Sequence, residues 1–315
     1  MPEILSSQNE ILVGACGLLD RSESGKLALT GSDARGVLQG QVTNDVEALT
    51  PGTGCYAALL TNKGKMLCDL RVLDAGEEVL LLCERSGLQE LFNALRRGLV
   101  GFDAELHKRT VQRGLLSLIG PGARAVVGAE DLPGEEHAHR AGELAGVPVR
   151  FVVTDLGIDV LCRAEDTEAV TAGMVDRGAK PVDEDAAEIV RVESGRPRFG
   201  PDLGPTVIPE EAGLNERAVS YTKGCYVGQE TVARLHWRGK PNRHLRGLRL
   251  SAPAEPGAAL RLGEKEVGRV ASTVVSPRFG PIALALVRRQ AEPGTQLAVG
   301  EAGVSAEVVT LPFAG

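Results

Sequence analysis

Hydrophobic spacing along the first third of the chain changes from a helical to an alternating period. The polar pair Ser32 and Asp33 precedes apolar positions at helical spacing as far as Val42, which predicts a helix capped by that pair. From Ser86 the spacing is helical again. Between these helices, short apolar runs separated by turn residues predict strands at 55–60, 66–73 and 79–83.

The middle of the chain repeats this mixture of strands and helices. The segment 132–146 is charged and glycine-rich, so we predict a surface loop there. His137 and His139 lie in this loop, and we do not expect them to bind a metal. Around the loop, the spacing predicts strands at 115–119, 147–153 and 158–162 and helices at 165–178 and 183–192.

The last third consists of short apolar runs separated by proline and glycine. This pattern starts near Arg246, ends at Val309 and is typical of a small β-barrel. We therefore predict an α+β protein. Its expected domains are an N-terminal α+β domain at 1–110, a second α+β domain at 111–236 and a C-terminal β-barrel at 237–315.

Composition narrows the classes of protein that this chain can be. Its 315 residues are 43% hydrophobic and 24% charged, which excludes a disordered chain. No apolar run approaches about 18 residues, and six cysteines are scattered without a Cys-x-x-Cys pair. We therefore expect a cytoplasmic protein with reduced thiols, no membrane partner and no metal site. The net charge of −7 and the 3% of aromatic residues argue against direct DNA binding.

The segment 223–230 has the most unusual chemistry in the chain. It places a cation, a thiol, a phenol, an amide and a carboxylate around two glycines. Lys223 stands two residues before Cys225, and a nearby cation favours the thiolate, which is the nucleophilic and metal-binding form. The alternative is a glycine turn with a buried, inert cysteine.

A basic stretch begins in the same segment. Residues 223–249 contain seven Lys or Arg side chains and a single acid, Glu230, which gives a net charge of +6 in an acidic chain. Such a stretch suits an anion, for example a polyglutamate tail, a phosphate or an RNA backbone. The alternative is a solvated basic edge of the barrel.

Two acids stand in apolar surroundings. Asp69 lies inside a predicted strand, and Glu193 lies at the end of a predicted helix, where the helix dipole disfavours a carboxylate. Burial would raise the pKa of Asp69 and make it a candidate base or hydrogen-bond acceptor. The alternatives are surface pairs, of Asp69 with Arg71 and of Glu193 with Arg191 or Arg196.

Taken together, these residues resemble the YgfZ family, which comprises folate-binding proteins of iron–sulfur cluster assembly and tRNA modification. That family is related to the glycine-cleavage T-protein, an aminomethyltransferase. The segment 223–230 resembles the motif that defines YgfZ-type members. The segments 38–46, 191–195 and 276–287 are similar to motifs that the wider T-protein family shares.

The resemblance implies three domains around a central channel that holds tetrahydrofolate or another folate derivative. Asp69 matches the acid near the reactive folate nitrogens, and Glu193 matches the glutamate that hydrogen-bonds the pterin ring. The catalytic residues that we predict are Cys225, Asp69 and Lys223. The folate-binding residues that we predict are Asp69, Glu193, Arg191, Asn44, Tyr226, Gln229 and Arg234.

Three functions follow as hypotheses. The first is a folate-binding accessory factor for the assembly or repair of iron–sulfur clusters, with Cys225 as its working thiol at the channel mouth. Its partners would be iron–sulfur proteins or cluster carriers and, indirectly, tRNA-modifying enzymes. The second is a tetrahydrofolate-dependent aminomethyltransferase in which Asp69 is a base or electrostatic stabiliser. The third is a tRNA-binding module that uses residues 223–249.

Overall fold

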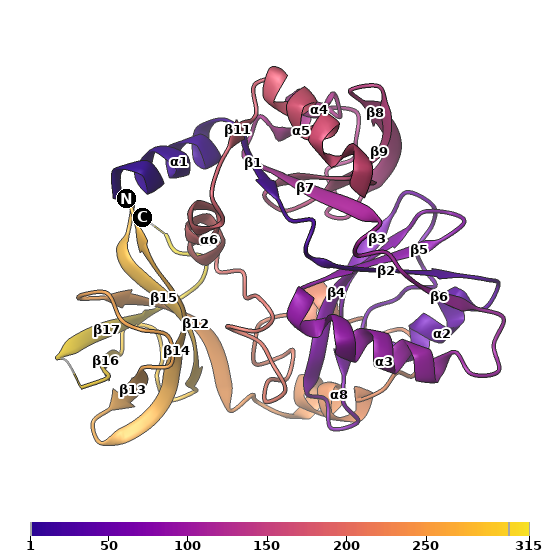
Figure 1. The fold of residues 1–315 in the computed structure, drawn as a ribbon. Coiled ribbons are helices and arrows are strands. Elements are labelled where there is room, and N and C mark those ends of the chain that lie inside the picture. The colour runs from indigo at the N-terminus through magenta and orange to yellow at the C-terminus, as the bar shows by residue number, and fades with distance from the viewer. Residues whose placement is uncertain (1, 302, 315) are drawn as a thin grey trace.

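Three groups of strands organise the chain. The structure is a computed structural model that describes residues 2–301 and 303–314. Within these residues the strands form a five-stranded sheet, a six-stranded sheet and a closed barrel of six strands. Figure 1 shows the three groups as three lobes, with the two ends of the chain close together beside the barrel. The predicted α+β class and the C-terminal barrel are confirmed.

The five-stranded sheet contains the strands predicted in the first third of the chain. One face of it packs against helices α2 (Ala34–Gln41) and α3 (Leu88–Gly98), whose apolar side chains share a core with alternate residues of the strands. All neighbouring strands are antiparallel. Their order is β3 (Gly54–Leu60), β4 (Met66–Asp74), β5 (Val79–Cys83), β2 (Gly25–Thr30) and β6 (Glu105–Lys108).

The six-stranded sheet combines the middle of the chain with one early strand. Helices α4 (Ala123–Val127) and α5 (Thr167–Asp176) share its core. The strand order is β11 (Lys180–Pro181), β1 (Gly17–Asp20), β7 (Arg113–Ile119), β10 (Gly157–Arg163), β9 (Val147–Val153) and β8 (His139–Leu144). Our prediction of a surface loop at 132–146 is wrong in part, because β8 pairs along its length with β9.

The two sheets face each other through an apolar cluster. Leu73 and Leu82 of the first sheet contact Leu115, Val152 and Leu161 of the second. These side chains occupy the faces that point away from the helices, so each sheet is covered on both sides. This packing holds β4 and β5 opposite β7 and β10.

The barrel follows the segment that contains the short helices α7 (Asn215–Ala218) and α8 (Gln229–Arg238). Helix α6 (Glu184–Glu193) packs between the barrel and the N-terminal helix α1 (Pro2–Gly14). No helix within residues 2–301 and 303–314 is both long enough and apolar enough to cross a membrane. The barrel order is β12 (Arg243–Leu250), β15 (Gly280–Arg288), β14 (Lys265–Ser276), β13 (Ala259–Leu262), β16 (Gln296–Val299) and β17 (Val304–Val309).

Candidate functional site

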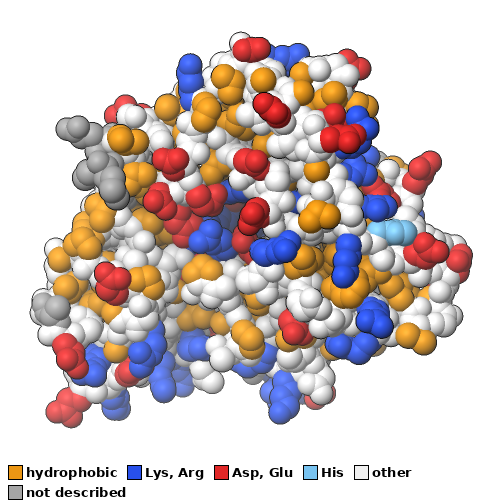
Figure 2. All heavy atoms as spheres, viewed as in Figure 1, with side chains coloured by type: hydrophobic (Ala, Val, Ile, Leu, Met, Phe, Trp, Pro, Cys, Tyr) orange, Lys and Arg blue, Asp and Glu red, His pale blue; other side chains and the backbone are white. Residues whose placement is uncertain are grey.

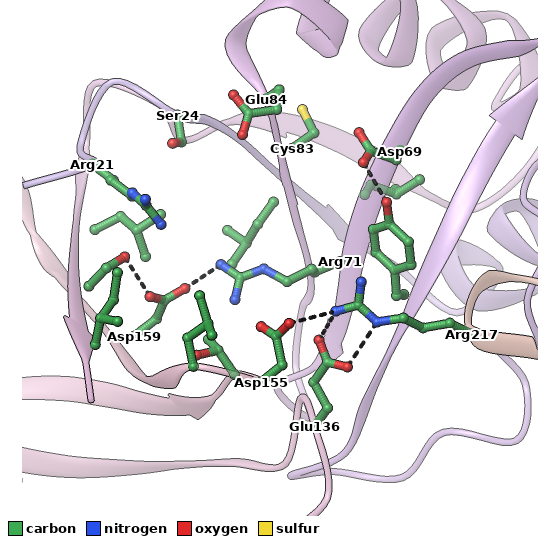
Figure 3. A pocket seen from close by; sticks show the side chains of 18 residues that line it. Arg21, Ser24, Asp69, Arg71, Cys83, Glu84, Glu136, Asp155, Asp159 and Arg217 are labelled. Carbon is green, nitrogen blue, oxygen red and sulfur yellow. Dashed lines mark hydrogen bonds and ion pairs between the residues drawn. The ribbon is translucent and has the colours of Figure 1, made fainter. Parts of the chain in front are cut away.

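A charged cavity lies between the two sheets, next to the apolar cluster that joins them. β4 and β5 form one wall, and β7 and β10 form the other. Leu73 and Val152 fill one end of the space between the sheets, whereas Arg71 and Asp159 occupy the other end. The inner part of the cavity has a volume of about 220 Å³, and Figure 3 shows the side chains that line it.

Ion pairs tie the cavity walls together. Arg71 Nη2 lies 2.5 Å from Asp159 Oδ2, and the Ser117 hydroxyl donates to Asp159 Oδ1 at 2.6 Å. Arg217 of α7 donates to Glu136, and its Nη2 lies 3.8 Å from Asp155 Oδ2. Because carboxylates match both guanidinium groups, these two arginines support the walls and are not free to bind an anionic ligand.

Asp69 projects from β4 into this cavity. The residue is 8% exposed, and the Tyr56 hydroxyl donates to its Oδ2 at 2.5 Å. The other oxygen, Oδ1, is buried and accepts no hydrogen bond from any residue that the structure describes. Burial raises the pKa of Asp69 to about 6, although the hydrogen bond from Tyr56 acts in the opposite direction. Oδ1 is therefore an unused acceptor inside the cavity.

The alternative of a surface pair between Asp69 and Arg71 is therefore wrong, because Asp69 is buried against Tyr56 and Arg71 pairs with Asp159. The guanidinium of Arg217 lies 4.7 Å from the centre of the Tyr56 ring. Strand β3 supplies Tyr56, so the Asp69 carboxylate is held by its neighbouring strand.

The inner cavity opens into a wider outer part of about 470 Å³, a size that suits a drug-sized or cofactor-sized ligand. Figure 2 shows acidic and basic side chains gathered around a hollow in the middle of this face. The residues that line both parts are Arg21, Ser24, Tyr56, Asp69, Glu84 and Arg217.

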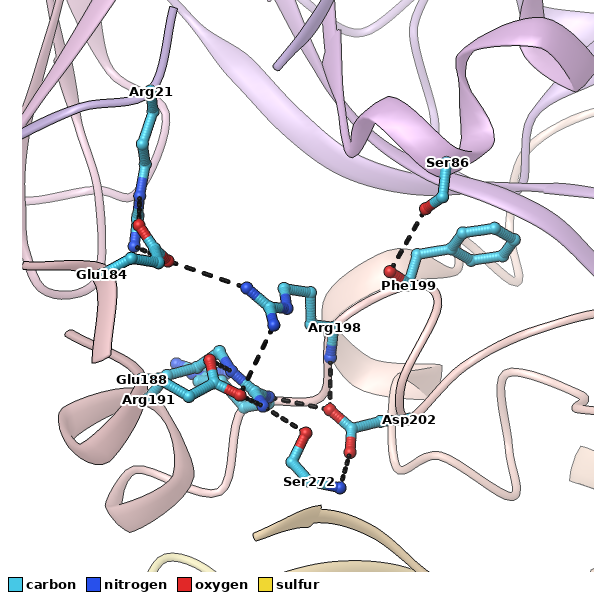
Figure 4. Close-up of polar contacts among 10 residues, drawn as sticks. Arg21, Ser86, Glu184, Glu188, Arg191, Arg198, Phe199, Asp202 and Ser272 are labelled. Carbon is cyan, nitrogen blue, oxygen red and sulfur yellow. Dashed lines mark hydrogen bonds and ion pairs between the residues drawn. The ribbon is translucent and has the colours of Figure 1, made fainter. Parts of the chain in front are cut away.

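Arg191 lines the outer part and holds it together. Its guanidinium lies 2.6 Å from Glu188 and 2.9 Å from Asp202, and it donates to the Ser272 hydroxyl at 2.5 Å (Figure 4). These contacts connect α6, the loop around Asp202 and β14. Arg191, one of the predicted folate-binding residues, thus lines the outer part of the cavity, and two carboxylates neutralise its charge.

Glu193 ends α6 and is buried, with 7% of its surface exposed. The Ser276 hydroxyl, at the end of β14, donates to its Oε1 at 2.5 Å. No described group donates a hydrogen bond to its Oε2. The alternative, a surface Glu193 paired with Arg191 or Arg196, is therefore wrong. It lines neither part of the cavity around Asp69.

Asn44 supports the cavity from behind. Its Nδ2 donates to the backbone oxygen of Tyr56 at 2.8 Å and to that of Arg217 at 3.3 Å. Both of these residues line the cavity, whereas Asn44 does not. The structure thus gives Asn44 a positioning contact with two cavity residues.

Lys223 is buried away from solvent and binds backbone. Its ammonium group donates to the carbonyl oxygens of Gln39, Val42 and Asn44 at 2.6, 2.7 and 2.8 Å. Burial lowers the pKa of Lys223 to about 8. Among the residues described, no hydrogen bond joins Lys223 to Cys225, so we infer that the ammonium holds the end of α2 instead of activating the thiol.

The rest of the segment 223–230 lies outside the cavity. Cys225 is exposed, while the other five cysteines are buried or half-buried. Tyr226 packs into an apolar core beside β3 and β4, and burial raises its pKa to about 12. Gln229 begins α8, and Arg234 is exposed on the same helix. None of these four residues lines the space around Asp69.

The basic stretch does not form one cationic face. Lys223 is internal, and Arg243 is held by Glu211 at 2.8 Å. Arg249 donates to the backbone oxygen of Ala314. The exposed cations that remain on and after α8 are Arg234, Arg238 and Lys240.

His137 and His139 are buried, each 3% exposed, which contradicts the predicted surface position. Burial lowers the pKa of His137 to about 3 and that of His139 to about 4. Within the described part of the chain, no group of three or more His, Cys, Asp or Glu side chains is arranged to hold a metal.

Sequence reasoning missed several cavity residues. The pairing of β3 with β4 places Tyr56 against Asp69. Arg217 comes from helix α7, 148 positions after Asp69 in the chain. Asp159 had a usable signal, because it is an acid inside an apolar strand, as Asp69 is. Glu84 had one too, since it directly follows the apolar strand β5.

Two family descriptions match the chain in succession. Residues 4–223 match the family described as the GCVT N-terminal domain. Residues 243–314 match the glycine cleavage T-protein C-terminal barrel domain. The two matches cover the two facing sheets and the barrel, respectively.

Named relatives match nearly the whole of this chain. An aminomethyltransferase of Rubrobacter xylanophilus is 29% identical over 322 residues, covering 98% of this chain and 86% of the relative. A chloroplastic protein of Arabidopsis thaliana named as a transferase is 29% identical over 304 residues, covering 92% of this chain and 70% of the relative. The crystal structure of aminomethyltransferase T from Bartonella henselae superposes with a TM-score of 0.87 at 23% identity, covering 98% of this chain and 89% of that chain.

Proposed function

The chain belongs to the glycine cleavage T-protein family, and from this we propose that it binds tetrahydrofolate in the cavity around Asp69 and transfers an aminomethyl-type one-carbon unit to it. Relatives named as aminomethyltransferases match nearly the whole chain, which supports this class of reaction. The observation that carries the proposal is the buried, unpartnered Oδ1 of Asp69.

The donors of a reduced pterin fit this acceptor. A buried carboxylate oxygen without a partner costs about 1–3 kcal/mol or more, so a site that keeps one is expected to receive a donor from a ligand. A pterin ring offers several N–H groups in a row. Glu193 Oε2 is a second acceptor without a protein donor among the described residues, although it stands apart from the Asp69 cavity.

The roles of the residues follow from their contacts. Bound tetrahydrofolate supplies the nitrogen atoms that accept the one-carbon unit. Asp69 accepts an N–H hydrogen bond through Oδ1 and, with a pKa of about 6, exchanges a proton with that group near neutral pH. Tyr56 orients the carboxylate through Oδ2, and the ion pair between Arg71 and Asp159 holds the cavity walls in place.

Calorimetric titration with 5-formyl-tetrahydrofolate tests this proposal. We expect the wild type to bind with a Kd in the micromolar range, and we expect Asp69→Asn to weaken binding at least tenfold because the amide presents fewer acceptor sites to the ring. Asp176→Asn is the matched control, since Asp176 is exposed at the end of α5. A wild type that binds no folate would overturn the proposal.

The exposed thiol of Cys225 favours a second candidate function. In this alternative the chain is a YgfZ-type accessory factor for iron–sulfur cluster assembly, and folate binding supports that role. Cys225 is reachable by a partner thiol or an iron atom, in contrast to the buried Cys16, Cys68, Cys83 and Cys162. Because Cys225 lies outside the cavity around Asp69, this function and aminomethyl transfer use different parts of the molecule.

This separation makes the two candidates distinguishable. In a strain that lacks the gene, the accessory function predicts a fall in cluster-dependent tRNA thiolation that the wild type restores and Cys225→Ala does not. Aminomethyl transfer predicts release of ammonia from an aminomethyl donor in the presence of tetrahydrofolate, abolished by Asp69→Asn and unchanged in Cys225→Ala. Full rescue of thiolation by Cys225→Ala would show that the accessory function does not need this thiol.

A further inference from the structure

Glu84 is a cavity carboxylate to which the proposed mechanism assigns no role. It directly follows β5, where Leu80 and Leu82 point toward the second sheet. The alternation of the strand continues to Glu84, which lines both the inner and the outer part of the cavity. Figure 3 shows Glu84 and Asp69 on the same side of the pocket, with Cys83 between them.

Strand register places Glu84 opposite Asp69. Arg71 of β4 pairs with Leu82 of β5 in an antiparallel ladder. Continued two residues beyond this last paired position, the register sets Asp69 across from Glu84, on the same face of the sheet. Side chains at directly opposed positions have Cβ atoms about 4.5–5.5 Å apart, and two like charges there are destabilising.

Cations offset this repulsion only in part: Arg217 lowers the pKa of Asp69, and nearby arginines lower that of Glu84. Among the residues described, no Lys or Arg forms an ion pair with Asp69 or Glu84, and no group donates a hydrogen bond to the Glu84 carboxylate. Tyr56 is the one donor to Asp69 within this set, and it leaves Oδ1 free. Five carboxylates and three guanidinium groups line the inner cavity, and the guanidiniums of Arg71 and Arg217 are already paired.

Burial leaves both acids easier to protonate than usual. Burial raises the pKa of Asp69 to about 6, and the charge of Glu84 raises it further, against Tyr56 and Arg217. Burial also raises the pKa of Glu84. The charged groups that face Glu84 from other elements are Arg198, Arg21 and Arg191, which lower its pKa, and Glu184, which raises it.

We infer that Asp69 and Glu84 act as a coupled carboxylate pair in which the charge of Glu84 favours a proton on Asp69, and that a ligand which donates N–H groups to both carboxylates displaces this proton. The inference rests on the proposed function, because it names the donor-rich part of the folate as the group that faces the pair. Glu84 is thus a further acid–base residue of the site. The proton leaves through the outer cavity, which Glu84 also lines.

Calorimetry in two buffers of different ionisation enthalpy tests this pairing with 5-formyl-tetrahydrofolate at pH 6.5. We expect the wild type to release a measurable fraction of one proton on binding, and Glu84→Gln to release less than half as much. Glu84→Asp keeps the carboxylate and should retain most of the release. Glu90→Gln is the control with the same charge change, because Glu90 is exposed in the first turn of α3.

A ligand-free measurement separates this inference from the proposed function. The titration of the Asp69 carboxyl, followed by carbon NMR, should move to lower pH in Glu84→Gln, because the opposing charge is gone. An unchanged Asp69 titration together with unchanged proton release would overturn the inference while folate binding stands. A wild type that shows the coupled titration without binding folate would contradict the proposed function, and with it the role of the pair toward folate.

Discussion

The Asp69 carboxylate destabilises the fold at neutral pH. Its pKa rises from the ordinary 3.8 to about 6 because burial disfavours its charge. The folded state therefore binds more protons than the unfolded state between these two values, so this group's contribution to stability is complete below pH 3.8 and is lost as the pH rises through 6. A buried charge of this kind is typical of functional sites.

We therefore predict that Asp69→Asn stabilises the protein while it weakens folate binding. The amide resembles the protonated acid, so the free energy of unfolding at pH 7.5 should rise by up to about 3 kcal/mol, and the gain should vanish toward pH 4. Urea denaturation at the two pH values measures this difference. Equal destabilisation by Asp69→Asn at both pH values would contradict the assigned environment.

Single residues were predictable where their local context was unusual. Asp69 and Glu193 stood out as acids among apolar neighbours, and both are buried. Lys223 was singled out for its chemistry, but its three carbonyl partners lie about 180 positions earlier in the chain and no local pattern announces them. Tyr56 was missed for the same reason, since only strand pairing brings it to Asp69.

Among the elements, α8 depends on one glycine at its start. Gly228 has a φ of 85°, and a Cβ there would lie 2.5 Å from the backbone oxygen of Thr61. Only glycine adopts this backbone without strain at such a close approach. Gly228 therefore holds the segment that contains Cys225 against the turn between β3 and β4.

Gly228→Ala should destabilise the protein by about 1–3 kcal/mol, because it adds both a positive φ strain and a clash with backbone. Gly224→Ala is the matched control: its Cβ would meet no atom within 4 Å, and its stability should change by less than about 0.5 kcal/mol. Thermal unfolding of both variants provides the comparison. Equal stability of the two would show that α8 is not anchored at Gly228.

Strands and helices with a strong period were predicted well. The apolar runs that form β4, β5 and β9 lie within two residues of their predicted ends. Hydrophobic spacing did not predict β8, because half of its residues are polar. This strand forms because β9 pairs with it. The short β1 was likewise missed, since its place between β7 and β11 depends on pairing partners about 100 or more residues away.

On the scale of the whole molecule, the cavity exists because two sheets and the α6–barrel region converge. Asp69 comes from the first sheet, Asp159 from the second and Arg191 from α6. The division at residues 110 and 236 stays a prediction, and limited proteolysis of the folded chain would test it. Membership of the T-protein family agrees with this architecture across nearly the whole chain.

The most direct test of the account is a crystal structure of the chain with 5-formyl-tetrahydrofolate. We predict that the pterin ring occupies the cavity between the sheets and that a ring N–H donates to Asp69 Oδ1 at about 2.9 Å. Glu84 should then lie on the same side of the ring as Asp69. A folate bound elsewhere on the molecule, with Asp69 Oδ1 still without a donor, would contradict the account.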